Sequence, residues 1–392
     1  MTDLEFMKTA ALIFLFAMFL PSCTKDNGGT KSGDGRVYYP ASEFVMGADL
    51  SYVNEILDHG GVYKDSSMTE DPYRIFQEYG ANVARFRLFY NPEWTADAYN
   101  PPAAHMYSGF DDVKKGMAAA KAHGMLTCLD FHYSDSWADP SKQVPPAAWS
   151  SLTLTELHDS LYQYTFKTLT RLKNAGLMPE YVQVGNEINP GFLLPQGDRW
   201  NHKTDFIYLL NSAISAVRTV SASAGTDTKI IIHIAAPENV SYWFDGMASA
   251  GLTDFDIIGI SYYYMWSTVP LQNLGDYIRN IRTTFGKDVM IMETCYPWTT
   301  GYADNYGNII NQSKLVQGYP ASIQGQYDYM VKLVTEVADG GGKGIFYWEP
   351  AWITSQMNDS YGVGSAWECN TLFDFYGNVL KGMNYMTTKY SF

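Results

Sequence analysis

Two segments of the chain each carry apolar, β-type residues directly into a glutamate. They are Tyr181-Val-Gln-Val-Gly-Asn-Glu187 and Val289-Met-Ile-Met-Glu293, about a hundred residues apart. In a parallel barrel the C-terminal ends of all strands open on one face, so two such glutamates can converge on one substrate bond. Hydrolysis of a glycosidic bond requires a carboxyl group on each side of that bond. The pattern therefore predicts a pair of catalytic carboxylates, Glu187 and Glu293.

Either glutamate taken alone has a simpler interpretation, as a helix cap or a residue of a surface loop. Two features favour catalysis over this alternative. Asn186 directly precedes Glu187, and both glutamates are followed by loops rich in aromatic residues or proline.

From residue 40 onward, eight short β-type segments alternate with helical segments, in which apolar residues recur every three or four positions. The β-type segments are 45–50, 82–89, 125–131, 181–186, 229–235, 256–262, 289–293 and 344–348, and the helical ones include 111–123, 153–175, 203–224, 273–285 and 323–338. The β-type segments are nearly free of polar residues, as strands buried on both faces must be. We therefore predict an α/β fold, a (β/α)8 or TIM barrel, with residues 40–392 as a single catalytic domain.

The composition agrees with one large barrel. Hydrophobic residues make up 46% of the 392 residues and charged residues 17%, with 30 Tyr and 10 Trp that suit stacking on sugar rings. The net charge of −14 argues against nucleic acid or an anionic membrane surface as a partner. Neither an internal repeat nor a mid-chain linker divides the sequence, and we expect a monomer.

The first 23 residues are predicted to be a targeting segment. The apolar run 9–20 is too short to span a bilayer and ends at Leu20-Pro-Ser-Cys23, which resembles a bacterial lipoprotein signal with Cys23 as the lipidated N-terminus. Asp3 and Glu5 are acidic where such a signal is basic, so translation from Met7 is an alternative start. A secretory signal without lipid is the second alternative.

Residues 24–39 are predicted to form a flexible polar tether. The protein is then expected to be secreted, held in the outer membrane by its lipid and displayed at the cell surface. Cys128, Cys295 and Cys369 fit no zinc spacing, and their odd number allows at most one internal disulfide. They are most simply small buried hydrophobic residues.

Polar and aromatic residues cluster just after the predicted strands. Each cluster alone is weak: His132 can be a hydrogen-bonded structural histidine, Arg85 can pair with a buried acid, and the tyrosines can be core residues. Their recurrence at the same end of successive strands favours a binding site. The clusters are 85–91, 132–139, 261–266 and 347–352.

The stretches GADLSYVNEI, GANVARFRLFYNP, LDFHYSDSWADPSKQVPPAAW, VQVGNEINPG, IGISYYYMW, IMETCYPW, GIFYWEPAW and WECNTLFDFYGN together resemble glycoside hydrolase family 53, the arabinogalactan endo-β-1,4-galactanases. The resemblance covers residues 44–377. It implies a retaining endo-hydrolase that cleaves the β-1,4-galactosidic bonds of galactan and type I arabinogalactan, which are pectin side chains. No cofactor is implied for the chemistry.

The resemblance implies Glu187 as general acid/base and Glu293 as nucleophile, with Arg85 and Tyr263 as hydrogen-bond partners of Glu293. Asn186 is expected to hold the sugar 2-hydroxyl. The remaining expected substrate contacts are Trp348 and one of Trp137 or Trp298 for stacking, Asp49, His132 and Asp135 for hydroxyls or for positioning the acid, and Tyr90 for lining the groove.

Some bacterial relatives hold calcium in the loop after the seventh strand. Here Asp304 and Asn308 match, but Tyr302 and Tyr306 stand where stronger ligands are expected, so a structural calcium competes with a loop that binds no ion.

Two other functions stay open: a β-1,4-glycanase of the same clan that cleaves mannan, cellulose or xylan, and a lipid-anchored protein that binds glycan without cutting it. A pure binder has no use for two carboxylates.

Overall fold

The computed structural model describes residues 30–31, 33, 35–252, 254–310 and 315–392. The predicted signal with Cys23, and residues 24–29 of the predicted tether, lie outside these residues. Within the described part of the chain, no helix is both long and apolar enough to cross a membrane.

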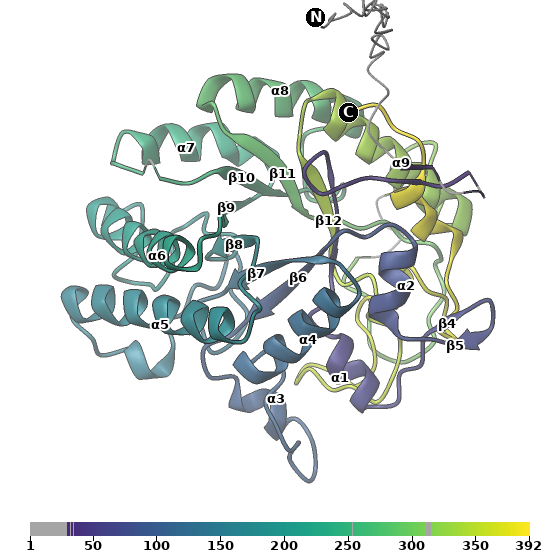
Figure 1. Cartoon of the computed structure of the whole chain (residues 1–392), viewed down its shortest axis with the longest axis horizontal. Helices are drawn as coiled ribbons and strands as arrows, with labels where there is room; N and C mark the ends of the chain where they lie inside the picture. Colours follow the sequence, from purple (N-terminus) through teal and green to yellow (C-terminus); the bar gives the residue numbers. More distant parts are fainter. Residues whose placement is uncertain (1–29, 32, 34, 253, 311–314) are drawn as a thin grey trace, which may run out of the picture.

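Eight parallel strands close into a barrel at the centre of the molecule, and helices surround them (Figure 1). The strands are β3 (Val45–Asp49), β6 (Val83–Leu88), β7 (Leu126–Phe131), β8 (Tyr181–Val184), β9 (Lys229–Ala235), β10 (Ile257–Ser261), β11 (Asp288–Glu293) and β12 (Gly344–Tyr347). The barrel closes where β12 pairs with β3. The predicted (β/α)8 barrel is confirmed, with one strand in each of the eight predicted segments.

The five long helices that the apolar spacing predicts are also present. They are α4 (Phe110–Ala122), α5 (Leu154–Asn174), α6 (Lys203–Ala224), α8 (Leu274–Phe285) and α9 (Ile323–Asp339). Four further helices were not predicted, because five to nine residues give too few turns for a clear apolar period. These are α1 (Val53–Asp58), α2 (Pro72–Glu78), α3 (Glu93–Asp97) and α7 (Val240–Ala248).

The inside of the barrel changes from apolar to polar along the strands. Near the strand starts, Val45, Val83, Cys128, Tyr181, Ile231, Ile257, Met290 and Phe346 form one apolar cluster with Met292. Further along, seven of the eight strands each contribute a buried polar residue, which we call the polar layer. It consists of Asp49, Arg85, Asp130, Gln183, His233, Ser261 and Glu293. The polar layer lies at the strand ends, where a barrel enzyme carries its site.

The folded part begins before residue 40, so the predicted tether is too long at its C-terminal end. Val37 and Tyr39 are buried, and β1 (Thr30–Lys31) pairs with β2 (Val37–Tyr38). The Tyr39 hydroxyl donates to the Thr388 carbonyl at 3.1 Å. These contacts fix residues 37–39 against the C-terminal segment.

Candidate active site

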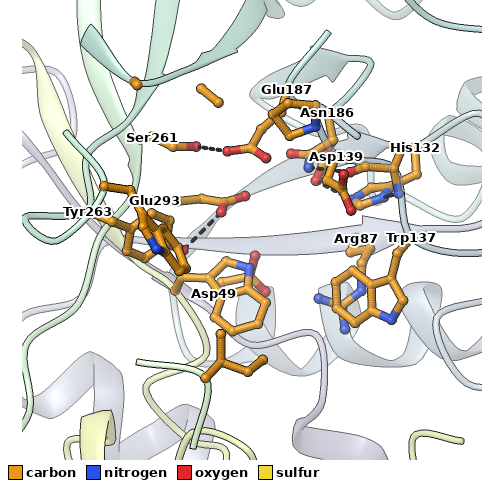
Figure 2. Close-up of a pocket in the computed structure, with 18 of the residues that line it drawn as sticks. Asp49, Arg87, His132, Trp137, Asp139, Asn186, Glu187, Ser261, Tyr263 and Glu293 are labelled. Carbon is orange, nitrogen blue, oxygen red and sulfur yellow. Dashed lines mark hydrogen bonds and ion pairs between the residues drawn. The ribbon is translucent and has the colours of Figure 1, made fainter. Parts of the chain in front are cut away.

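A cleft of about 570 Å³ opens at the C-terminal ends of the strands. Glu187 and Glu293 both line it, and their carboxyl groups point toward the same space (Figure 2). The predicted residues that also line it are Asp49, Arg85, His132, Trp137, Asn186, Tyr263 and Trp348.

A tight turn places Glu187. Strand β8 ends at Val184, two residues earlier than predicted, because Gly185 and Glu187 adopt φ of +80° and +46°. The left-handed conformation costs a residue with a Cβ about 1 kcal/mol, and such strain is often found at functional sites. The side-chain amide of Gln143 stabilises the turn by donating to the Asn186 carbonyl at 2.8 Å.

A β-bulge places Glu293. Ile260 of β10 lies opposite Ile291, whereas the next residue, Ser261, lies opposite Glu293, so Met292 is an extra residue. Simple alternation would send Glu293 to the side of Ile291, which belongs to the large core cluster that includes the helices. The bulge turns the glutamate into the barrel instead.

Three hydrogen bonds stabilise Glu293 as an anion. Arg85 donates from Nη1 and Nη2 to Oε1, each at 3.0 Å, and the Tyr263 hydroxyl donates to Oε2 at 3.0 Å. These are the two partners that the resemblance implied. Burial raises the pKa of Glu293 to about 7, and Arg85 and Tyr263 oppose this rise.

Glu187 is in an environment that favours its neutral form. Burial and, after it, the negative charge of Glu293 together raise its pKa to about 8. The one hydrogen-bond partner of its carboxyl group within the described residues is Ser261, whose Oγ lies 2.5 Å from Oε1. Glu293 therefore loses its proton before Glu187 does as pH rises. At intermediate pH, Glu293 is the carboxylate and Glu187 is the acid.

Arg85 is the centre of the polar layer. It is 1% exposed and donates to Asp49 at 2.9 Å and to Asp130 at 2.8 Å, in addition to Glu293. The simpler interpretation of Arg85, that it pairs with a buried acid, is therefore correct, and Arg85 also contacts Glu293. One guanidinium thus pairs with three carboxyl groups.

His132 lines the cleft, but both of its ring nitrogens have protein partners. Nε2 lies 3.1 Å from Asp130 Oδ2, and Nδ1 accepts from the Ala138 backbone N–H at 3.0 Å. Burial lowers the pKa of His132, so the ring is neutral. It orients Asp130 and the loop after β7.

Aromatic rings form one side of the cleft. Trp137 lies over the Arg87 guanidinium at 4.1 Å and has its ring centroid 6.2 Å from that of Trp348. Trp348 in turn meets Trp367 edge to face at 4.6 Å. These rings offer the apolar surface on which a sugar ring stacks.

The structure does not bring three of the expected residues to the cleft. Asp135 accepts from the backbone N–H groups of Asn91 and Ala147, so it braces two loops. Trp298 donates to the Glu368 carbonyl and packs on Phe375. Tyr90 lies against Trp149 and Tyr164.

Asp304 and Asn308 do not fit a calcium site. Both carboxylate oxygens of Asp304 are occupied: Oδ1 accepts from the Tyr306 N–H at 2.7 Å, and Oδ2 accepts from Thr354 and Ser365. In the part of the chain that the structure describes, no group of three or more His, Cys, Asp or Glu side chains could hold a metal. The three cysteines beyond Cys23 are buried free thiols, Cys128, Cys295 and Cys369.

Several residues of the site were not singled out from the sequence. Some lie in strands whose sequences are almost entirely apolar. A single polar residue at an inward-facing position of such a strand was the feature that could have identified them. Others lie in loops. They are Asp130, Gln183, His233 and Trp367, whereas Arg87, Asp139, Ser261 and Trp266 lay within the predicted clusters 85–91, 132–139 and 261–266 without a role of their own.

A (β/α)8 barrel with an anionic and a neutral carboxyl group facing one aromatic-lined cleft defines a barrel glycosidase. Residues 45–386 match the model of glycosyl hydrolase family 53, and the chain belongs to this family. Such enzymes need no cofactor for the chemistry.

Named relatives agree with this assignment. The chain is 41% identical over 338 residues to an arabinogalactan endo-β-1,4-galactanase of Cellvibrio japonicus. This match covers 84% of this chain and 86% of the relative. It is 35% identical over 321 residues to an endo-β-1,4-galactanase of Bacillus subtilis, with 79% and 71% covered. The solved family 53 catalytic domain of Ignisphaera aggregans superimposes with a TM-score of 0.80 at 32% identity, covering 90% of this chain and 98% of that one.

Proposed function

We propose that this protein is an endo-β-1,4-galactanase that hydrolyses galactan and type I arabinogalactan with retention of configuration. The observation that carries the proposal is the difference between the two buried carboxyl groups: Glu293 receives three hydrogen bonds, whereas Glu187 has a hydroxyl as its neighbour. The galactanase activity of relatives that match most of the chain supports the substrate.

The mechanism assigns one role to each group. Glu293 attacks the anomeric carbon while Glu187 protonates the departing oxygen, and a water activated by Glu187 then releases the glycosyl group. Arg85 and Tyr263 hold the nucleophile in its ionised form. Asn186 is expected to hold the sugar 2-hydroxyl; its position in the lining of the cleft and the hydrogen bond from Arg85 that orients its side chain support this role.

The aromatic lining suits a polymer. We infer that Trp137, Trp348 and Trp367 meet the galactose unit near the reacting bond. Trp266 is 54% exposed and lines the same cleft, so it is placed to extend the sugar surface outward. This extension supports cleavage within chains rather than at their ends.

The substrate assignment is tested by following the products from unbranched β-1,4-galactan over time. We expect a ladder of galacto-oligosaccharides early in the reaction, and much slower hydrolysis of cellulose, mannan and xylan. Faster hydrolysis of one of these glycans would assign the enzyme to that substrate, and release of monosaccharide alone would exclude an endo mode. Binding of galactan without any product would instead indicate a non-catalytic binding protein.

The pH dependence of kcat/KM follows from the two carboxyl groups. Activity requires Glu293 ionised and Glu187 protonated, so it is lost below the pKa of Glu293, about 7, and above that of Glu187, about 8. We expect a bell-shaped profile with its maximum between the two values, measured under conditions where substrate is far below KM. A profile that keeps rising well above pH 8 would contradict the assignment of Glu187 as acid.

We further propose that the protein is an outer-membrane lipoprotein anchored through Cys23 and displayed at the cell surface. The motif at residues 20–23 and the polar residues that follow it support this location. Replacing Cys23→Ser should release the enzyme from the membrane fraction without changing its activity on short galacto-oligosaccharides. Protease treatment of intact cells should digest the native protein, and complete protection would place it in the periplasm.

A further inference from the structure

A line of hydrogen bonds runs from Glu187 into the interior of the barrel. Glu187 Oε1 lies 2.5 Å from Ser261 Oγ, and this oxygen lies 2.8 Å from His233 Nε2. On the other side of the imidazole, His233 Nδ1 lies 2.9 Å from Asn186 Oδ1. Ser261 and His233 are buried, and Figure 2 marks the link between Ser261 and Glu187.

The position of the histidine proton follows from Asn186. The amide nitrogen of Asn186 donates to the Ala138 carbonyl at 2.8 Å, which fixes the orientation of the amide. Its Oδ1 accepts from Arg85 and from Gln183, each at 3.0 Å. An oxygen can only accept, so the hydrogen between Asn186 and His233 belongs to Nδ1 of the histidine.

The position of the serine proton follows from His233. Burial, assisted by the charge of Arg85, lowers the pKa of His233 well below its ordinary value, so the ring is neutral and Nε2 carries a lone pair. The single proton of Ser261 must then lie on the bond to Nε2. The short contact between Ser261 and Glu187 therefore needs a proton from the carboxyl group of Glu187.

We propose that His233 and Ser261 are positioning residues that keep Glu187 protonated until it transfers this proton to the leaving oxygen. This inference rests on the proposed hydrolysis. In the first step the Glu187 proton passes to the glycosidic oxygen, while the bond from that oxygen to C1 breaks and the bond from Glu293 to C1 forms. The Ser261 hydroxyl then turns from His233 to the new Glu187 carboxylate.

The second step restores the starting state. Water forms its bond to C1 and gives a proton to Glu187, while the bond from C1 to Glu293 breaks. The Ser261 hydroxyl returns to His233. No group other than water and the sugar chain is consumed, and the proton count of the enzyme is unchanged after one turnover.

The competing arrangement has Ser261 donating to an ionised Glu187, with His233 as a packing residue. The other charged groups are common to both arrangements. Glu187 interacts with Glu293, Asp139 and Arg85. His233 interacts with Arg85, Asp130 and His132. Because substitution of Ser261 or His233 leaves these groups in place, a change in the pH profile reports the hydrogen-bond line itself.

The alkaline limb of kcat/KM on galacto-oligosaccharides distinguishes the two arrangements. In His233→Leu the serine hydroxyl is freed to stabilise an ionised Glu187, so the limb should move to lower pH by about one unit. If His233 only packs, the limb stays where it is. In Ser261→Ala the neutral Glu187 loses its acceptor, and the limb should again move down. A move to higher pH would show that the serine stabilises the ionised form of Glu187 more than the neutral form, and would overturn the proposal.

Two controls separate the effect of the hydrogen-bond line Glu187–Ser261–His233, which we call the relay, from general damage to the site. Ser212→Ala removes another buried hydroxyl, which donates to the His158 carbonyl between two helices, and should leave the pH profile unchanged. An aryl glycoside with an activated leaving group needs no proton from Glu187, so the His233 and Ser261 variants should lose less activity at high pH on it than on galacto-oligosaccharides. Equal losses on both substrates would indicate a structural role only.

A measurement on the unmodified protein avoids any question of folding. Nitrogen-15 NMR of the histidine rings should show His233 neutral and protonated on Nδ1 between about pH 5 and pH 8. Protonation on Nε2, or on both nitrogens, would overturn the proposal. Should another β-glycan prove to be the substrate, the same profiles measured on that glycan still test the relay, so the two proposals fail separately.

Discussion

Replacing Glu293→Gln or Glu187→Gln should leave a folded enzyme whose kcat on galactan is lower by about 10⁴-fold or more. The amide of Gln cannot attack C1 in place of Glu293 or protonate the leaving oxygen in place of Glu187. Gln has the shape of Glu, and Arg85 keeps Asp49 and Asp130 as partners, so the melting temperature should not fall with the activity. Glu43→Gln, just before the start of β3 at the opposite end of the barrel, is the matched control.

Chemical rescue separates the roles of the two glutamates. Azide should restore activity to Glu187→Ala on an activated aryl substrate and yield a β-glycosyl azide, because the anion attacks the glycosyl-enzyme from the face that Glu187 occupied. The same treatment of Glu293→Ala should give the α-azide. An α-configured product from the Glu187 variant would reverse the assignment of acid and nucleophile.

Arg85→Leu should abolish measurable activity and lower the free energy of unfolding by about 3–5 kcal/mol at neutral pH. The substitution leaves Asp49, Asp130 and Glu293 buried together without a cation. Carboxyl groups in such a site have a higher pKa in the folded protein than in the unfolded chain. The loss of stability relative to the wild type should therefore grow as pH rises from about 5 to 8.

Urea denaturation of Arg85→Leu across that pH range is the measurement. The control is Arg279→Leu, in which an arginine whose side chain is 54% exposed loses its pairing with Asp276. Its unfolding midpoint should stay near that of the wild type. If Arg85→Leu unfolded at the same urea concentration as the wild type, the guanidinium would not be the common counter-ion of the three carboxylates.

The barrel could be predicted because its signals are local. Each strand is a short apolar run, and the five long helices repeat their apolar residues over at least three turns. Helix α7 was missed because its buried residues Val240, Trp243, Phe244 and Met247 follow helical spacing for only two turns. The end of β8 was set two residues late because the left-handed turn at Gly185 and Glu187 is a matter of backbone conformation.

The catalytic pair was predictable, whereas much of its support was not. The glutamates and their immediate neighbours stand out at strand ends, but His233 is one polar residue within a run of isoleucines. Its importance depends on β8 and β10, which bring Asn186 and Ser261 to the two ring nitrogens. Likewise, Asp135 and Trp298 follow the strands as closely as the true lining residues do, and only loop geometry directs them elsewhere.

The division between strands and loops has a consequence for how such an enzyme can change. The residues that hold the proton and the nucleophile come mostly from the strands, while Trp137, Trp266, Trp348 and Trp367 come from the segments beyond them. Loop segments tolerate insertion and exchange far better than buried strands do. Grafted loops could therefore give this scaffold a new polymer preference while its reaction chemistry is inherited intact.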